Sequence, residues 1–403
     1  MFTINMTIAL SQRIHPQDIA AEKKKHLHRT KIRMVLNQRL IKDFRDKMNE
    51  SLVLHVFRDR NGRAEWNVIC SAVDWIETAV EGIDTDSLSR ENSSLASIRM
   101  ITFISCVDIL WNGVLQLHRV FADRDTEPFK TDSTVFNARC SDNIQWKTIR
   151  AIFAAHPVEL RNVYGGGERE RWFASWSGGT FSHGDFGVFL YSNKPGVQSR
   201  VFDIQFADVF RFAEKRYLYL NDLMTAADDC LNEYKRKQAS QSIDIDKENV
   251  LEWIEKLIIE NHQRWNNDTI NYNLESARDV FQVVPRCDTN RKALEQYKPV
   301  IILQLEQIHQ MLQNMDLDSE IMDVEGDYPE TLMHPIEKLF TAEYDDPIFR
   351  YGVDAVQNYL GDVVDLNVQE TVKEIQTIAR AGLWAKDKQQ NSKDCEKPVL
   401  CGH

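Results

Sequence analysis

The stretch WKTIRAIFAAHP, residues 146–157, is the segment around which the rest of the chain is organised. Its apolar and aromatic side chains recur at Trp146, Ile149, Phe153 and His156, a spacing typical of one face of a helix. Pro157 disfavours the helical conformation at the residue before it. The stretch therefore predicts a buried helix that ends on a histidine.

One arginine lies six residues before that histidine. On an ideal helix Arg150 and His156 are roughly 120° apart around the axis and about 9 Å apart along it. The two side chains are therefore not neighbours by default, although a long arginine next to a terminal histidine leaves some freedom. His156 could have a structural role instead of a catalytic one, because the helix dipole favours a histidine at the C-terminus of a helix.

The preceding segment is also helical by pattern. Residues 94–121 are apolar nearly all round, which indicates a central helix. Its longest apolar run, 101–117, contains Asp108 and Asn112, so we expect a buried helix and no membrane span. A polar connection over 122–142 then leads to the Arg150/His156 helix.

An Arg-x5-His pair at the end of a buried helix resembles the Arg-x(4–6)-His signature of the HEPN superfamily, in the layout of its abortive-infection-type members. The resemblance covers about residues 64–225, including the "LHRVF" end of the 94–121 helix. It implies a metal-independent endoribonuclease of toxin or phage-defence type that uses no cofactor.

In such an enzyme Arg150 would hold the scissile phosphate through a forked, charge-assisted contact. His156 would move protons between the 2′-hydroxyl, the leaving oxygen and solvent. Members of the family commonly form homodimers, in which two such pairs share one cleft. The position after the arginine is often polar in active members and is Ala151 here. The alternatives are a catalytically silent dimerisation or nucleotide-binding scaffold, and an unrelated helical adaptor.

A glycine-rich segment over 161–180 follows the helix, and it matches neither a P-loop nor a dinucleotide fingerprint. Its arginines and tryptophans could hold a phosphate and stack a base, or the tryptophans could pack on the core. We expect strands over 186–191 and 200–206, then a helix over 207–224. The candidate RNA-binding residues are Arg161, Arg169, Arg171, Trp172, Trp176 and His183.

We predict a mainly α (α+β) fold: a HEPN-like helical bundle with a short β-hairpin insertion, followed by a second all-helical region. Residues 1–63 would hold a basic helix over 18–48 and a hairpin with strands at 52–57 and 66–70. The HEPN-like domain would span 64–225, a linker 226–247, an acidic all-helical domain 248–385, and a disordered tail 386–403.

Charge is distributed unevenly along the 403 residues. The net formal charge is +8 over 1–63, −5 over 64–225 and −15 over 226–403. The basic residues of 1–63 could contact the phosphate backbone of a nucleic acid, or they could be a solvated helix face. The acidic region 226–403 could bind a regulatory protein partner. The seven cysteines form no CxxC pair, and an acidic segment at 316–329 does not fit an EF-hand. We therefore expect no metal site, no membrane contact and a reducing, cytoplasmic setting.

Overall fold

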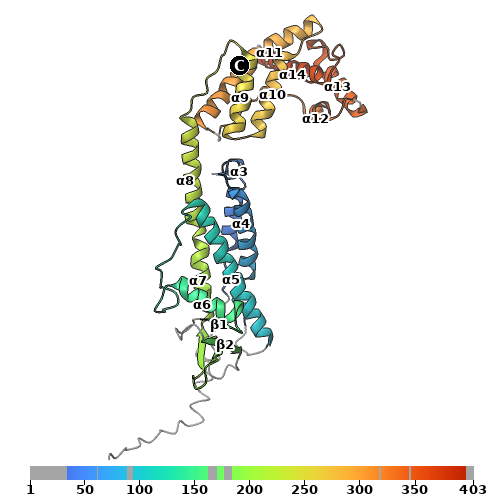
Figure 1. The fold of residues 1–403 in the computed structure, drawn as a ribbon. Helices are drawn as coiled ribbons and strands as arrows, with labels where there is room; N and C mark the ends of the chain where they lie inside the picture. Colours follow the sequence, from blue (N-terminus) through green and yellow to red (C-terminus); the bar gives the residue numbers. More distant parts are fainter. Residues whose placement is uncertain are drawn as a thin grey trace, which may run out of the picture. The chain divides into compact units, whose positions relative to one another are not determined.

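The computed structural model describes residues 34–60, 62–88, 94–161, 170–176, 184–316, 319–344 and 346–395. The chain is mainly helical with one small antiparallel sheet, which confirms the predicted fold class (Figure 1). It folds into two compact units. The first comprises 1–47 and 67–225, and the second 48–66 and 226–403, so that the later boundary falls inside helix α8 (Leu220–Ala239).

The first unit contains α2 (Gln38–Met48), most of α4 (Glu65–Gly82), the short η1 (Thr85–Ser87), α5 (Ser94–Phe121), α6 (Asp142–Arg150), the π-helical turn η2 (Ala151–Ala155) and α7 (Phe206–Leu218). The hydroxyl of Tyr217 on α7 accepts from the Ile41 amide on α2 at 3.0 Å and donates to the Asn37 carbonyl at 2.6 Å. Arg45 on α2 forms ion pairs with Asp74 and Glu77 on α4. These polar contacts tie both helices to the same core.

Helix α5 is the central element of this unit. It has the length and hydropathy of a membrane span, a test that core helices also pass, and half of its most apolar window is buried against the rest of the protein. Met100, Ile104, Val107 and Val114 are completely buried on it. Its packing against α7 and η2 supports the interpretation of 101–117 as a core helix.

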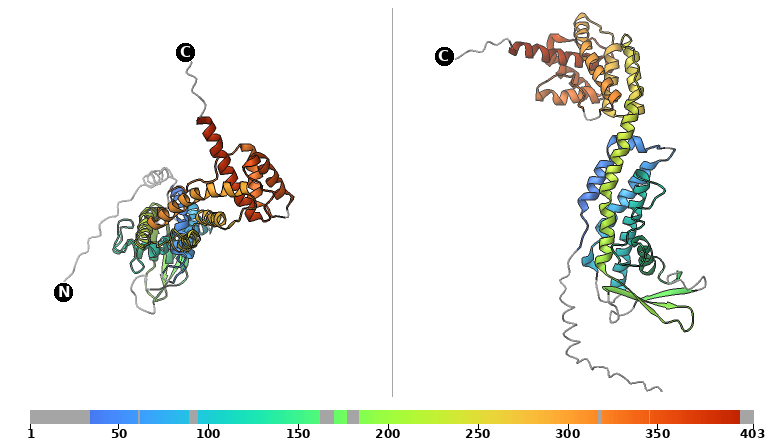
Figure 2. Two further views of the ribbon diagram at one scale, coloured as in Figure 1. Left: turned by 90° about the horizontal axis from the view of Figure 1, so that it is seen from above. Right: turned by 90° about the vertical axis from the view of Figure 1, so that its left-hand side faces the viewer.

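Four strands form one sheet in the order β1-β2-β3-β4: β1 (Leu160–Arg161), β2 (Arg171–Trp176), β3 (Phe186–Ser192) and β4 (Arg200–Ile204). All neighbours are antiparallel, with Trp172 opposite Ser192 and Phe186 opposite Ile204. Figure 2 shows the longer strands as arrows at one end of this unit's helices. The predicted strands over 186–191 and 200–206 are confirmed to within two residues at each end. The sheet is larger than a hairpin because the chain around 171–176 is also a strand.

The second unit is helical. It contains α3 (Ser51–Phe57), the last part of α8, α9 (Val250–Arg264), α10 (Asp268–Gln282), α11 (Asp288–Asn314), α12 (Met333–Thr341), α13 (Pro347–Leu360) and α14 (Val372–Cys395), with 3-10 turns at Glu330–Leu332 and Gly361–Val363. Trp265 Nε1 donates to the Ser51 hydroxyl at 3.0 Å, and His55 Nε2 lies 3.0 Å from the Gln263 carbonyl. Helix α3 is thereby attached to the end of α9.

Several sequence-based boundaries are wrong. The expected hairpin over 52–57 and 66–70 consists of helices α3 and α4, because apolar runs this short fit a helix as well as a strand. The expected linker at 226–247 is largely the second half of α8, and 386–395 continues α14 instead of forming a tail. Of the expected basic helix over 18–48, the structure describes 34–48, where the helix begins only at Gln38.

Candidate active site

Helix α6 is fixed to the core by its first two turns. The Trp146 ring is 1% exposed and stacks on Phe212 of α7, with 4.9 Å between ring centroids. Asn143 Oδ1 accepts a hydrogen bond of 2.8 Å from the fully buried guanidinium of Arg216. Burial lowers the pKa of Arg216 to about 10, and the carboxylates of Asp132 and Asp142 oppose that shift, so the group stays protonated near neutral pH.

Arg150, at the end of α6, reaches a carboxylate of α5. Its Nη1 donates to both oxygens of Asp108, at 3.3 and 3.2 Å, and Trp146 Nε1 donates to Asp108 Oδ1 at 3.3 Å. The Arg150 side chain is 40% exposed. Asp108 is its one partner within the described residues, so Nε and Nη2 are left for an anion. The ion pair therefore both joins two helices and orients a partly exposed guanidinium.

The turn between the two predicted catalytic residues is a π turn. Its defining hydrogen bond runs from the His156 amide to the Ala151 carbonyl, five residues apart, at 3.0 Å. This wider turn replaces the α-helical spacing assumed from the sequence. Such turns are rare and occur often at functional sites. The His156 side chain is exposed, so the histidine is not the buried core residue that its apolar stripe suggested.

The sheet holds this turn from the other side. Phe153 is completely buried, and its ring contacts Trp176, Phe186 and Phe202, with centroids 6.0 to 6.1 Å apart. The amide of Ala174 on β2 donates to the Pro157 carbonyl at 2.7 Å. The segment after the histidine thus runs along the edge of β2, and His156 sits where the helix meets the sheet.

The structure gives the predicted RNA-binding residues four different outcomes. Trp172 is only 2% exposed and has the Arg200 guanidinium 5.4 Å from its ring, so the prediction that it stacks a base is wrong. Trp176 is half-buried against Phe153. Arg171 donates to the Glu159 carboxylate at 3.2 Å, which secures the segment that follows His156. The side chain of Arg161 and all of Arg169 and His183 lie outside the described residues.

The sequence-based interpretation missed the outer face of the sheet. Side chains alternate along a strand, so Trp172 and Trp176 of β2 point inward while Phe173 points outward. Phe173 is paired directly with Tyr191 of β3, and these residues are 39% and 46% exposed. Phe189 adds a third ring, 6.2 Å from Tyr191. The alternation would have identified this face had 171–176 been recognised as a strand.

Within the described residues no three or more His, Cys, Asp or Glu side chains gather as metal ligands would. Comparison of the chain with models of protein families, with curated proteins and with solved structures finds no match. The assignment of function therefore rests on the geometry of the Arg150/His156 segment and on the chemistry of these side chains.

Proposed function

We propose that the first unit is a metal-independent endoribonuclease of the HEPN type, with Arg150 and His156 as its catalytic residues. The observation that supports this most is the exposure of both side chains at the two ends of one π turn, in which Ile152 and Phe153 are completely buried. If Arg150 and His156 had only packing roles, their side chains would not need access to solvent.

The chemistry would divide between the two residues. Arg150, oriented by Asp108, offers Nε and Nη2 to a phosphate and stabilises the charge that develops on it. The His156 ring has no hydrogen-bonding partner among the described residues, so it could take a proton from a 2′-hydroxyl and return one to the leaving oxygen. Since these steps need only a fixed cation and an imidazole, no metal is required.

The outer face of the sheet would supply RNA binding without strong sequence preference. Exposed aromatic rings on a sheet stack bases, and each stacked base contributes about 1 to 3 kcal/mol. Phe173, Phe189 and Tyr191 would form this platform in the place of Trp172.

A homodimer is part of the proposal. Two apolar side chains flank the catalytic pair on the same segment: Ile144 is 55% exposed and Val158 is 75% exposed. Pairing of two such segments would cover them and bring two Arg150/His156 pairs into one cleft, so that an arginine of one copy could act with a histidine of the other.

The test is cleavage of an end-labelled RNA by the purified full-length protein, in EDTA, with Arg150→Ala and His156→Ala as variants. Lys147→Ala on the same helix and the exposed His334→Ala are matched controls. We expect both controls to cleave like wild type and both catalytic variants to lose at least about 100-fold in rate, since positioned proton transfer contributes that much. Fragments should end in a cyclic phosphate. Equal rates in all folded variants, or loss of cleavage in EDTA, would contradict the proposal.

One observation favours the scaffold alternative: the Arg150–Asp108 ion pair joins α6 to α5 and could be purely structural. A double-mutant cycle on these two residues separates the roles. An ion pair this exposed should couple by no more than about 1 kcal/mol in stability. If Asp108→Asn changes stability but leaves RNA cleavage and binding untouched, Asp108 is not a positioning residue. The scaffold alternative is supported only if Arg150→Ala also leaves RNA cleavage and binding untouched.

A further inference from the structure

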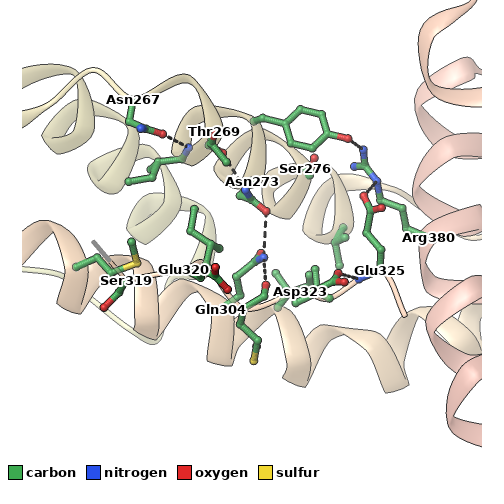
Figure 3. A pocket seen from close by; sticks show the side chains of 18 of the residues that line it. Asn267, Thr269, Asn273, Ser276, Gln304, Ser319, Glu320, Asp323, Glu325 and Arg380 are labelled. Atoms are coloured by element: carbon green, nitrogen blue, oxygen red, sulfur yellow. Dashed lines mark hydrogen bonds and ion pairs between the residues drawn. The ribbon is translucent and has the colours of Figure 1, made fainter. Parts of the chain in front are cut away.

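The second unit contains a half-open cavity that the proposed ribonuclease does not use. It lies between α10, α11, α14 and the segment 319–325, and has a volume of about 490 Å³, which is within the usual range for small-molecule sites (Figure 3). Part of its wall is apolar, formed by Ile270, Val280, Ile301, Met311 and Ile321. A cavity of this size and mixed character could hold a ligand with both methylene and polar groups.

Two buried polar groups in the wall have unused hydrogen-bonding capacity. Tyr297 is 1% exposed, and its hydroxyl makes no hydrogen bond within the described part of the chain. Gln304 is 2% exposed, and its Nε2 donates to Asn273 Oδ1 at 3.0 Å and to the Met322 carbonyl at 2.9 Å. Its carbonyl oxygen Oε1 has no donor among the described residues. Both side chains line the cavity, so each oxygen can form a hydrogen bond with a ligand bound there.

Among the described residues that line the cavity, Arg380 is the one cation, and the Glu325 carboxylate lies near it. Arg380 Nη2 donates to the Tyr272 hydroxyl at 2.5 Å, Nε lies 3.8 Å from the Glu325 carboxylate, and the guanidinium stacks 4.6 Å from the Phe340 ring centroid. Arg380 therefore links α14 to α10 and to the segment beside the cavity, although its buried Nε donates no hydrogen bond within the described residues.

The carboxylates that remain give the cavity a negative potential. Glu320 and Asp323 lie on the segment 319–325 and form no ion pair in the described part of the chain. Figure 3 shows Glu320 and Asp323 near Gln304, whereas Glu325 of the same segment lies beside Arg380. Because the surrounding region 226–403 has a net charge of −15, a phosphate or carboxylate would be repelled and a cation attracted.

We propose that this cavity binds a small aliphatic amine of the polyamine kind. Its ammonium groups would pair with Glu320 and Asp323, one N–H would donate to Gln304 Oε1, and the Tyr297 oxygen would accept another. Its methylene chain would lie along Ile301 and Val280. This inference is independent of the proposed ribonuclease, because every residue in it belongs to the second unit.

The experiment is isothermal titration of the full-length protein with spermidine, with ATP as an anionic probe and the fluorescence of Trp265, which lines the cavity, as a second readout. Tyr297→Phe removes only a hydroxyl, and Glu320→Gln removes only a charge. We expect each to weaken spermidine binding about tenfold or more, as the loss of a charge-assisted hydrogen bond does.

The matched control is Asp354→Asn, which removes one exposed negative charge from α13 of the same unit, away from the cavity. It should bind spermidine like wild type. Equal weakening in Asp354→Asn and Glu320→Gln would mean diffuse attraction to an acidic surface and would overturn the proposal. So would the absence of spermidine binding, or tighter binding of ATP than of spermidine.

Discussion

Replacing Phe153 by alanine should destabilise the first unit and release the segment that holds His156. The ring is completely buried and contacts three aromatic side chains, one on each of β2, β3 and β4. Phe→Ala changes in such cores cost about 3 to 5 kcal/mol, because transfer energy is lost and a cavity remains. For a unit of this size each kcal/mol shifts the Tm by about 2 to 4 °C, so we expect a fall of about 6 to 20 °C.

The matched control is Phe173→Ala, on the outward face of β2, where the ring is 39% exposed. This change should cost about 1 kcal/mol, the range of strand preferences at a partly exposed position. Thermal unfolding followed by circular dichroism gives the Tm, and hydrogen exchange of the Ala151–His156 amides reports the π turn itself. If Phe153→Ala lowers the Tm no more than Phe173→Ala, or if the His156 amide stays protected in the variant, the sheet does not hold the turn and the reasoning fails.

Two further changes test the packing and the buried charges of the two units. A Cβ at Gly352 of α13 would lie 2.8 Å from the Leu339 nitrogen and the Pro335 carbonyl of α12, so Gly352→Ala should cost a net of about 1 to 2 kcal/mol in urea unfolding despite the better helix propensity of alanine. A Cβ at Gly82 would lie 2.5 Å from Cys106 Sγ, a side-chain atom that can move by rotation about one bond, so Gly82→Ala should cost less than Gly352→Ala. The reverse order would contradict the assignment of a close helix contact at Gly352. Burial lowers the pKa of His118 below its unfolded value near 6.5, so the unfolded chain binds more protons and stability should fall as pH drops from 7 to 5. His118→Asn should flatten that dependence in unfolding measured at both pH values, and an unchanged slope would show that His118 is not its source.

The HEPN resemblance, the ribonuclease and its partners remain proposals, whereas the secondary structure near the site follows closely from the chain. The helix at 94–121 has the predicted bounds, and α6 with its π turn ends at Ala155, one residue before the predicted end at His156. Long apolar periodicity and a proline act locally, so a single sequence suffices to place them. Short apolar runs such as 52–57 lack that length, which explains why α3 was predicted as a strand.

Only the tertiary structure shows which segments far apart in the chain contact each other. The π turn, and with it the relation of Arg150 to His156, depends on Phe153 packing against strands 20 to 50 residues away. The Asp108 carboxylate that orients Arg150 lies 42 positions earlier on another helix. The sequence by itself determined the long apolar helices such as 94–121 and the helix that ends before Pro157. It could not determine which side chains contact each other. Those contacts depend on how whole helices and strands pack, and the local pattern of apolar residues carries no information on that packing.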